Sequence, residues 1–243
     1  MTIDLARLDY IHQLQRAGYR PSERLAQNIL RSGDAAVGPL IELATSTDQL
    51  FLESPERFAP VHALRLLGEL RPLQMIEPLL RSFAMYGDDE QLARRMWETE
   101  VPQILGRLGA PAAEPLWAIV DDAGYTPDQR AIAIMALAYA TAVEPELRAP
   151  VIAGLRERLA ASEDKTFTGH LIAGLANLGA GEAYQEVMAL FRAGEVDLEI
   201  ATAAQARQFL LTQSPKRLGC VKHPLWERYD EHGPTPDQEL AAQ

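Results

Sequence analysis

The chain is poor in cysteine, in long apolar runs and in positive charge, and each shortage argues against a class of protein. Its single cysteine, Cys220, rules out intrachain disulfides and zinc sites built from several thiolates. No apolar run reaches the roughly 18 residues of a membrane-spanning helix. The amino-terminal segment also lacks the basic and apolar regions of a signal peptide. The sequence therefore predicts a cytoplasmic protein that has no membrane partner.

The net charge is −11, from 23 Lys and Arg against 34 Asp and Glu. Binding to DNA or RNA depends strongly on basic side chains that meet phosphates, and no basic stripe offsets this acidic excess. The composition therefore argues against a nucleic-acid partner. Acidic clusters such as Asp88-Asp89-Glu90 fit helix starts and solvated faces better than sites for a divalent ion.

Motifs of the common enzyme classes are also missing. The sequence has no His-Glu-x-x-His, no phosphate-binding glycine loop, no Gly-x-Ser-x-Gly and no kinase signature. It has no calcium-binding loop either. We therefore expect no cofactor and no metal site. Catalysis by groups that converge from distant parts of the chain stays open.

What the sequence does have is a proline that recurs at intervals of 35 to 39 residues, each time before a short apolar run. Internal periods of this size indicate a supersecondary unit stacked on copies of itself, because one unit cannot bury its own apolar face. The prolines are Pro39, Pro78, Pro115 and Pro150, and Glu186 takes that place in a fifth copy.

Each unit carries two helical patterns. The residues that follow each proline form an apolar stripe of period 3.6, and the segment before it carries a Leu-x-x-Leu pair such as Leu67 and Leu70. Breaks such as Gly33-Asp34 separate the two helices, and Thr126-Pro127 marks a helix start. Strand alternation and tight hairpin turns are missing from the sequence. It therefore predicts an all-α protein.

Two stretches, His62 to Leu80 and Ile104 to Trp117, resemble the HEAT-like repeats first noted in phycobiliprotein lyases. The likeness covers roughly residues 22 to 192. We therefore expect a right-handed α-solenoid of about five HEAT-like helix pairs. That family includes scaffolds, lyases and DNA glycosylases, so the resemblance implies a fold and leaves the activity open.

The expected solenoid domain covers residues 1–213, with a capping helix at 1–18, the repeats at 22–192 and a closing helix at 197–213. Residues 214–243 form a proline-containing extension. Three side chains are expected to hold this extension to the surface: Leu225, Trp226 and Tyr229.

The second helices of such repeats line a concave surface, where variable polar columns would face a partner. We expect a non-enzymatic scaffold or adaptor that binds a protein or peptide there. The expected binding residues are Glu42, Arg81, Asp121, Arg156 and Arg192.

A second polar column lies at the edge of an apolar face, where His62, Glu100 and His170 occupy equivalent positions. A hydrogen bond between His62 and Glu100 is expected from the stacking of adjacent repeats. The alternative function is an enzyme or a chromophore-lyase-like activity in the groove, with Glu98, Glu100 and His170 as its candidate residues. Nucleic-acid binding of the DNA-glycosylase type is a third, less favoured alternative. Trp97 and Trp117 share their columns with apolar residues, so we expect both in the core.

Overall fold

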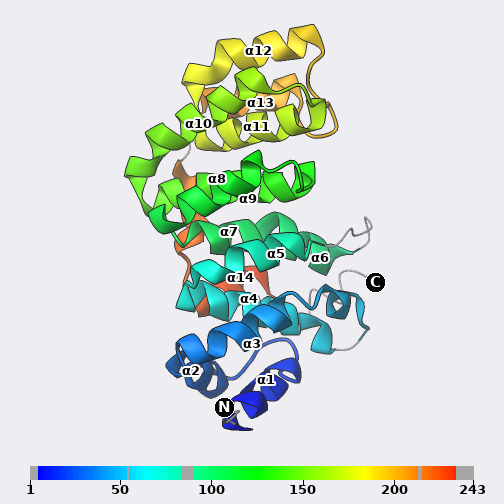
Figure 1. Cartoon of the computed structure of the whole chain (residues 1–243), viewed down its shortest axis with the longest axis vertical. Coiled ribbons are helices and arrows are strands. Elements are labelled where there is room, and N and C mark those ends of the chain that lie inside the picture. The colour runs from blue at the N-terminus through cyan, green and yellow to red at the C-terminus, as the bar shows by residue number, and fades with distance from the viewer. Residues whose placement is uncertain (1–4, 54, 84–89, 213–214, 234–243) are drawn as a thin grey trace. The chain divides into compact units, whose positions relative to one another are not determined.

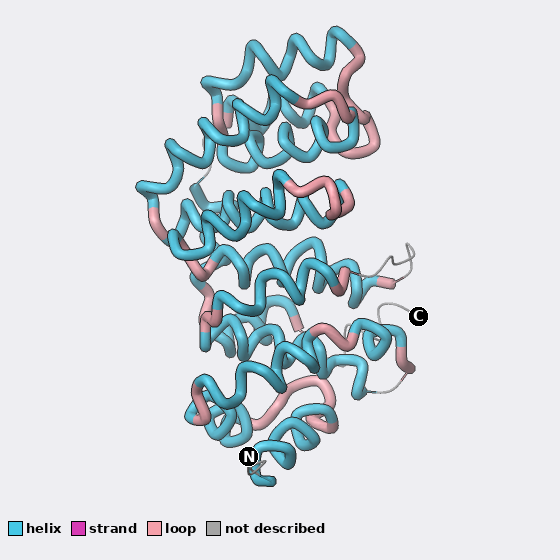
Figure 2. The backbone as a smooth tube through the Cα atoms, in the orientation of Figure 1, coloured by secondary structure: helices cyan, strands magenta, loops and turns pink. Residues whose placement is uncertain are grey.

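The structure is a computed structural model that describes residues 5–53, 55–83, 90–212 and 215–233. Within these ranges the ordered elements are all helical and no strand occurs (Figure 2). The prediction of an all-α protein is confirmed. None of the helices in the described ranges has the length and apolar character needed to cross a membrane.

The chain divides into two compact units, residues 1–104 with 223–243, and residues 105–222. The C-terminal segment thus returns to the first unit. The α-helices of that unit are α1 (Leu5–Gln15), α2 (Glu23–Arg31), α3 (Asp34–Ala44), α4 (Ala59–Leu70), α5 (Ile76–Arg81), α6 (Gln91–Arg95) and α14 (Leu225–His232). Its shorter turns are η1 (Thr47–Phe51), η2 (Pro55–Phe58), η3 (Leu73–Met75) and the π-helical η4 (Met96–Glu100).

Helix α7 (Val101–Gly106) contains the point at which the chain passes from the first unit to the second. The α-helices of the second unit are α8 (Ala113–Asp121), α9 (Pro127–Val143), α10 (Arg148–Ala161), α11 (Lys165–Leu178), α12 (Tyr184–Ala193) and α13 (Ala203–Leu211). Its 3-10 turns are η5 (Ala110–Ala112), η6 (Pro145–Leu147), η7 (Gly181–Ala183) and η8 (Pro215–Lys222).

The helix boundaries follow the local signals in the sequence. Thr126 caps α9 through a capping box with Gln129, and Gly179 ends α11 in the left-handed conformation at φ 61°. Helix α1 lies inside the expected capping segment 1–18, and α13 lies inside the expected closing segment 197–213. Asp88 and Asp89, which the sequence places at a helix start, lie outside the described residues.

In the first unit the neighbours of α4 include α1, α2, α3 and α14 (Figure 1). Residues Val61 to Gly68 of α4 are all buried, including the polar side chains of His62 and Arg65. A helix that is buried all round must find partners for its polar groups, because an unpaired buried charge is very costly. The first unit is thus built around a helix that carries polar groups into the core.

In the second unit one packing relation recurs. Helix α8 packs on α9, α10 packs on α11, and α12 packs on α13, while α11 also packs against both α9 and α13. Glycine lets two of these helices approach closely, because a Cβ atom at Gly174 of α11 would lie 2.5 Å from Ile134 Cγ2 of α9. The second unit therefore consists of successive helix pairs, with α9, α11 and α13 in one layer.

Candidate functional site

The first unit contains a buried network of charged side chains that α4, η4 and α14 bring together. Arg65 of α4 donates from Nε to Glu100 Oε1 at 3.2 Å, and its Nη2 donates to the same oxygen. Arg228 of α14 lies on the other side, with its Nη1 3.9 Å from Glu100 Oε2. Each of the three side chains is at most 1% exposed. One carboxylate is thus shared by two guanidinium groups.

Three further guanidinium nitrogens of this network donate to oxygen atoms. Arg65 Nη1 donates to the backbone carbonyl of Gly233, just after α14. Arg228 Nη1 donates to Gln103 Oε1 at 2.8 Å, and its Nε donates to the carbonyl of His223 at 3.1 Å. Buried charges are tolerated when they are paired and hydrogen-bonded in this way.

His62 forms a second part of the same network. Its Nε2 lies 2.7 Å from the carbonyl oxygen of Gly18, so this nitrogen carries the proton, and its Nδ1 then accepts from the Tyr229 hydroxyl at 2.7 Å. Burial lowers the pKa of His62 to about 4 and raises the pKa of Tyr229 above its ordinary value. Both groups are therefore neutral at physiological pH.

The aromatic side chains of α14 fix the helix further. The guanidinium of Arg65 lies 4.3 Å from the centre of the Tyr229 ring, and that of Arg20 lies 5.0 Å from the Trp226 ring. Arg20 also pairs with Asp230 at 2.6 Å. Leu225 and Tyr229 are buried, and Trp226 is half-buried. The burial of Leu225 and the contacts of Trp226 and Tyr229 anchor α14, the part of the expected extension that lies in the first unit.

The hydrogen bond expected between His62 and Glu100 is not formed. Both ring nitrogens of His62 have other partners, and Glu100 binds Arg65. The guanidinium of Arg65 is the stronger partner for a carboxylate because it is always charged and presents several donors. Two residues of the polar column, His62 and Glu100, are therefore buried and paired as polar groups, but they pair with other residues and not with each other.

The other two residues of the alternative polar site lie apart from this network. Glu98 is exposed and lies 4.0 Å from Arg94. His170 belongs to the second unit, where its Nε2 is 3.4 Å from Asp128 Oδ1 and burial lowers its pKa. The structure thus brings His62 and Glu100 into one network and leaves Glu98 and His170 outside it.

A smaller cluster lies beside α14. His223 precedes the helix, and Glu231 and His232 are in its last turn; His223 Nδ1 is 2.7 Å from Glu231 Oε2, and His232 Nε2 is 3.8 Å from the same oxygen. One ligand atom from each residue lies within 4.8 Å of the other two. Burial lowers the pKa of His232. Two imidazoles and a carboxylate are a donor set suited to a divalent transition metal.

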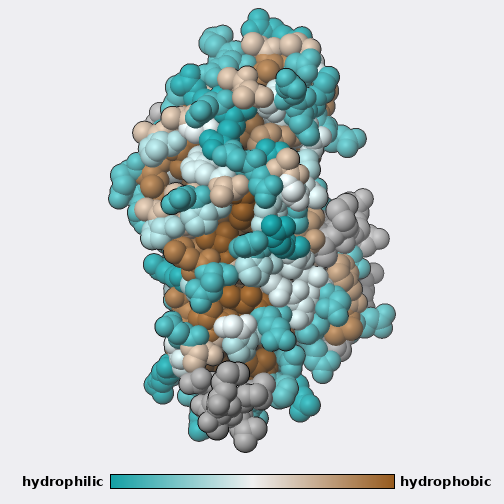
Figure 3. All heavy atoms as spheres, in the orientation of Figure 1, coloured by the Kyte–Doolittle hydropathy of each residue, from teal (hydrophilic) through white to brown (hydrophobic). Residues whose placement is uncertain are grey.

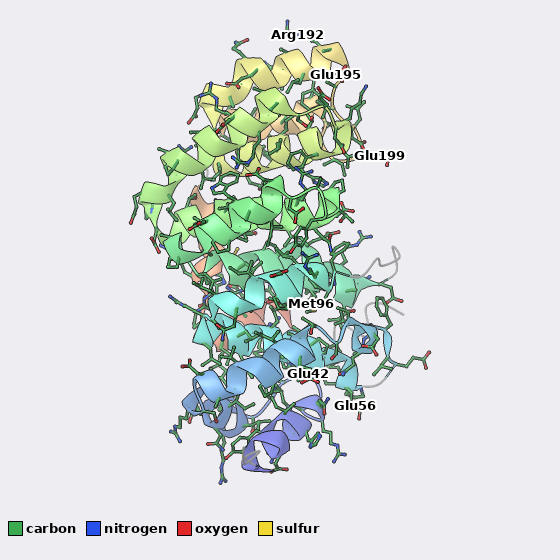
Figure 4. All side chains as sticks on the ribbon, viewed as in Figure 1. Glu42, Glu56, Met96, Arg192, Glu195 and Glu199 are labelled. Atoms are coloured by element: carbon green, nitrogen blue, oxygen red, sulfur yellow. The ribbon has the colours of Figure 1, made fainter. Side chains whose placement is uncertain are left out.

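The expected binding column is exposed in both units. Glu42 lies on α3 and Arg81 ends α5 in the first unit, where Arg81 Nε pairs with Glu77 at 2.9 Å. In the second unit Asp121 ends α8, Arg156 lies on α10 and Arg192 lies on α12. Figure 4 labels Glu42 and Arg192 on their helices.

Within the second unit, ion pairs link α10 to its neighbours α8 and α12. Arg158 of α10 pairs with Asp121 of α8, with Nε 2.6 Å from Oδ1. Arg156, also on α10, pairs with Glu186 of α12, with Nε 2.7 Å from Oε1. Hydrophilic side chains lie over α10 and α12, interrupted by small apolar patches (Figure 3). The helices α8, α10 and α12 thus form a neighbouring row with a charged outer surface.

Trp117 lies on this surface and differs from its expected place. Trp97 is fully buried as predicted, but Trp117 is half-buried, with the guanidinium of Arg158 4.0 Å from its ring centre. Its ring rests against Gly154 of α10, where a Cβ atom would lie 2.8 Å from Trp117 Cζ2. A position that is apolar in the other repeats can therefore lie at the surface where the neighbouring helix has a glycine, because the missing side chain leaves room for the ring.

Sequence reasoning missed Arg65, Arg228 and the cluster at His223, Glu231 and His232. Arginine is most often exposed, and nothing in the local sequence marks Arg228 as buried. One signal was available for Arg65, because it interrupts the apolar residues Val61 to Leu67 of a helix core. His223 and His232 are nine residues apart, and this spacing matches no common metal-binding motif.

No protein-family model matches the chain, and no curated protein matches it either.

Proposed function

We propose that the protein is a non-enzymatic helical-repeat scaffold that binds a protein or peptide on the face of its second helices. In this proposal the chain is a right-handed α-solenoid of about five HEAT-like pairs, and the bound face is concave. The recurrent packing of α8 on α9, α10 on α11 and α12 on α13 supports it. A cytoplasmic location and a partner other than nucleic acid are parts of the same proposal.

The observation that carries the binding function is the group formed by Trp117, Arg158 and Asp121. A tryptophan ring lies half-buried at the surface, an arginine stacks on it, and a carboxylate orients the arginine. Tryptophan and arginine are the residues most enriched at the energetic centres of protein interfaces. Arg158 is held in place before binding, so less side-chain entropy is lost when a partner arrives.

The charges around this group indicate what the partner offers. Asp121 and Arg156 have opposite signs and lie on neighbouring helices, with Arg192 further along on α12. A surface that carries both positive and negative side chains selects a partner whose charges have the complementary arrangement, and the partner's total charge matters less. We therefore propose a partner segment with an apolar or aromatic anchor for Trp117 and charged residues of both signs beside it.

The alternative, an enzyme or a chromophore-lyase-like activity, has less support. Glu100 is the most buried acid of the proposed groups, but Arg65 engages it and α14 packs on the helix that carries Arg65. A substrate would have to displace paired charges to reach this carboxylate, at considerable cost. A buried carboxylate that is held in an ion pair with Arg65 is better suited to holding the fold than to proton transfer.

Affinity capture tests the binding function. The full chain is immobilised, exposed to native cell lysate and washed, and the captured protein is identified, purified and titrated in solution. The variant D121K with R156E reverses two charges of the proposed face and keeps the net charge. We expect it to weaken the affinity by about tenfold or more. A tenfold loss of affinity corresponds to about 1.4 kcal/mol of binding free energy, and replacing a residue at the energetic centre of an interface typically costs more than that.

The matched control is E199K with R207E, which makes the same two charge reversals on exposed residues elsewhere in the second unit. It should bind as tightly as the wild type. Equal loss of binding in both variants, or no loss in either, would contradict the proposed face. Circular dichroism of all three proteins separates lost binding from lost folding.

A further inference from the structure

The cluster of His223, Glu231 and His232 combines three potential ligands at the two ends of one short helix. His223 lies two residues before the start of α14, and Glu231 and His232 are its last two residues. Side chains on a helix lean toward its N-terminus, so Glu231 reaches back toward His223. Their closest atoms are 2.7 Å apart, and the three ligand atoms lie within 4.8 Å of one another.

The surroundings of His232 favour a ligand at this point. Its Nε2 atom is buried and has no hydrogen-bond partner among the described residues. A buried polar nitrogen without a partner costs free energy, which a bound ion would recover. The cluster nevertheless lies at the surface, since the Glu231 side chain is 43% exposed and each histidine side chain is 25% exposed.

We propose that His223, Glu231 and His232 form a binding site for a divalent transition-metal ion, of which Zn²⁺ is the best fit. Zinc binds neutral imidazole nitrogen and carboxylate oxygen at about 2.0–2.2 Å, and three protein ligands leave its fourth position open. Oxygen-preferring ions such as Mg²⁺ and Ca²⁺ would find one carboxylate among two imidazoles, which suits them poorly.

A second carboxylate lies beside the proposed site. Glu227 Oε1 is 3.9 Å from His223 Nε2, the ring nitrogen opposite to the one that faces Glu231. A ligating histidine commonly directs its other nitrogen at a carboxylate, which orients the ring and raises its basicity. A small rotation of Glu227 would place it in that role.

Metal binding would join both ends of α14. This helix has eight residues, and isolated helices of that length are marginal in water. Its Arg228 and Tyr229 reach Glu100 and His62 in the core of the first unit. An ion held by His223, Glu231 and His232 would therefore stabilise the packed position of α14.

Zinc titration of the full chain tests the site. The protein carries no histidine tag, is stripped of metal and is titrated with Zn²⁺ against a chromogenic chelator of micromolar affinity, at a pH above the ordinary histidine pKa. We expect one equivalent to bind to the wild type and to H12A, whose exposed histidine lies on α1. Loss of a carboxylate that only supports a ligating histidine typically lowers metal affinity by roughly 10–100-fold. H223A, E231Q and H232A each remove a ligand itself, so each should lower the Zn²⁺ affinity by at least that much.

Two further measurements keep the test independent of folding. The ligand-field absorption of bound Co²⁺ in the wild type should show low coordination with nitrogen ligands, and E227Q should weaken Zn²⁺ less than H223A does. A wild type that fails to compete with the chelator would overturn the site. So would Zn²⁺ binding that H223A and H232A both retain at full strength.

Discussion

In the first unit α14 is held by buried guanidinium, carboxylate and imidazole groups, whereas in the second unit the helices meet through glycines and apolar side chains. The first unit buries the charged residues Arg65, Glu100 and Arg228. Among the described residues of the second unit, Arg107 is the buried charged side chain. The other charged side chains of the second unit lie mostly at the surface, as in the ion pairs that link α10 to α8 and α12.

The difference follows from how far along the chain each helix must return. The packed pairs of the second unit, α8 with α9, α10 with α11 and α12 with α13, are each consecutive in the chain, so a short connection places the two helices of a pair side by side. Helix α14 returns from a distance of 167 residues to meet His62, which costs loop-closure entropy and leaves its register unspecified by any turn. Directional hydrogen bonds supply that register, because Arg228 and Tyr229 satisfy their partners in one position only.

Breaking the buried ion pair should have the largest effect. Arg65→Met removes the guanidinium that binds Glu100 and leaves that carboxylate buried, with Arg228 at 3.9 Å as its remaining cation. Removing one partner of a buried pair costs about 3–5 kcal/mol of unfolding free energy. Urea unfolding of the full chain, followed by circular dichroism, measures this cost.

The matched control for Arg65→Met is Arg156→Met, which removes an exposed guanidinium that pairs with Glu186 in the second unit. It should leave the urea midpoint almost unchanged, because exposed ion pairs contribute little. The triple variant R65M, E100L and R228M should recover part of the loss, since it removes all three buried charges and strands none of them. If Arg65→Met and Arg156→Met shift the midpoint equally, the contrast between the two units is wrong.

Acid should weaken the first unit through His62. The unfolded imidazole takes up its proton near pH 6.5 but the folded one only near pH 4, so the unfolded state binds more protons in between. Stability is therefore lost as the pH falls through this window, by up to about 3 kcal/mol at 1.36 kcal/mol for each pKa unit. Unfolding free energies of the wild type and His62→Gln, measured from neutral pH down to pH 4, separate this share from that of other groups. Parallel curves for the two proteins would contradict the prediction.

Local features of the fold were predictable from the sequence. The break at Gly33 and the cap at Thr126 depend on backbone conformations and hydrogen bonds within a few residues. The polar column likewise identified His62 and Glu100 as unusual, because they interrupt an apolar face. These signals depend only on the helical period and on which residues tolerate burial.

The pairing of buried charges was not predictable, because it depends on contacts between residues far apart in the sequence. Arg65 and Glu100 are 35 residues apart, and Arg228 belongs to a segment with no repeat pattern. The ligands at His223 and Glu231 meet only because α14 is helical and both side chains are long. Nothing in the local sequence specifies where α14 lies.

A smaller effect should follow from filling the close approach of α9 and α11. A Cβ atom at Gly174 would lie 2.5 Å from Ile134 Cγ2 and 3.4 Å from Leu155 Cδ1, so Gly174→Ala forces these helices apart. Overpacking of this kind costs about 1–3 kcal/mol of unfolding free energy. The control is Gly68→Ala in α4, where the nearest atom is 3.2 Å away, at the end of the Ile104 side chain, and where alanine is the better helix former. We expect Gly68→Ala to lower the free energy of unfolding in urea by less than Gly174→Ala does. The reverse order would mean that the second unit tolerates a wider helix spacing than the first. It would also mean that glycine is not what brings α9 and α11 together.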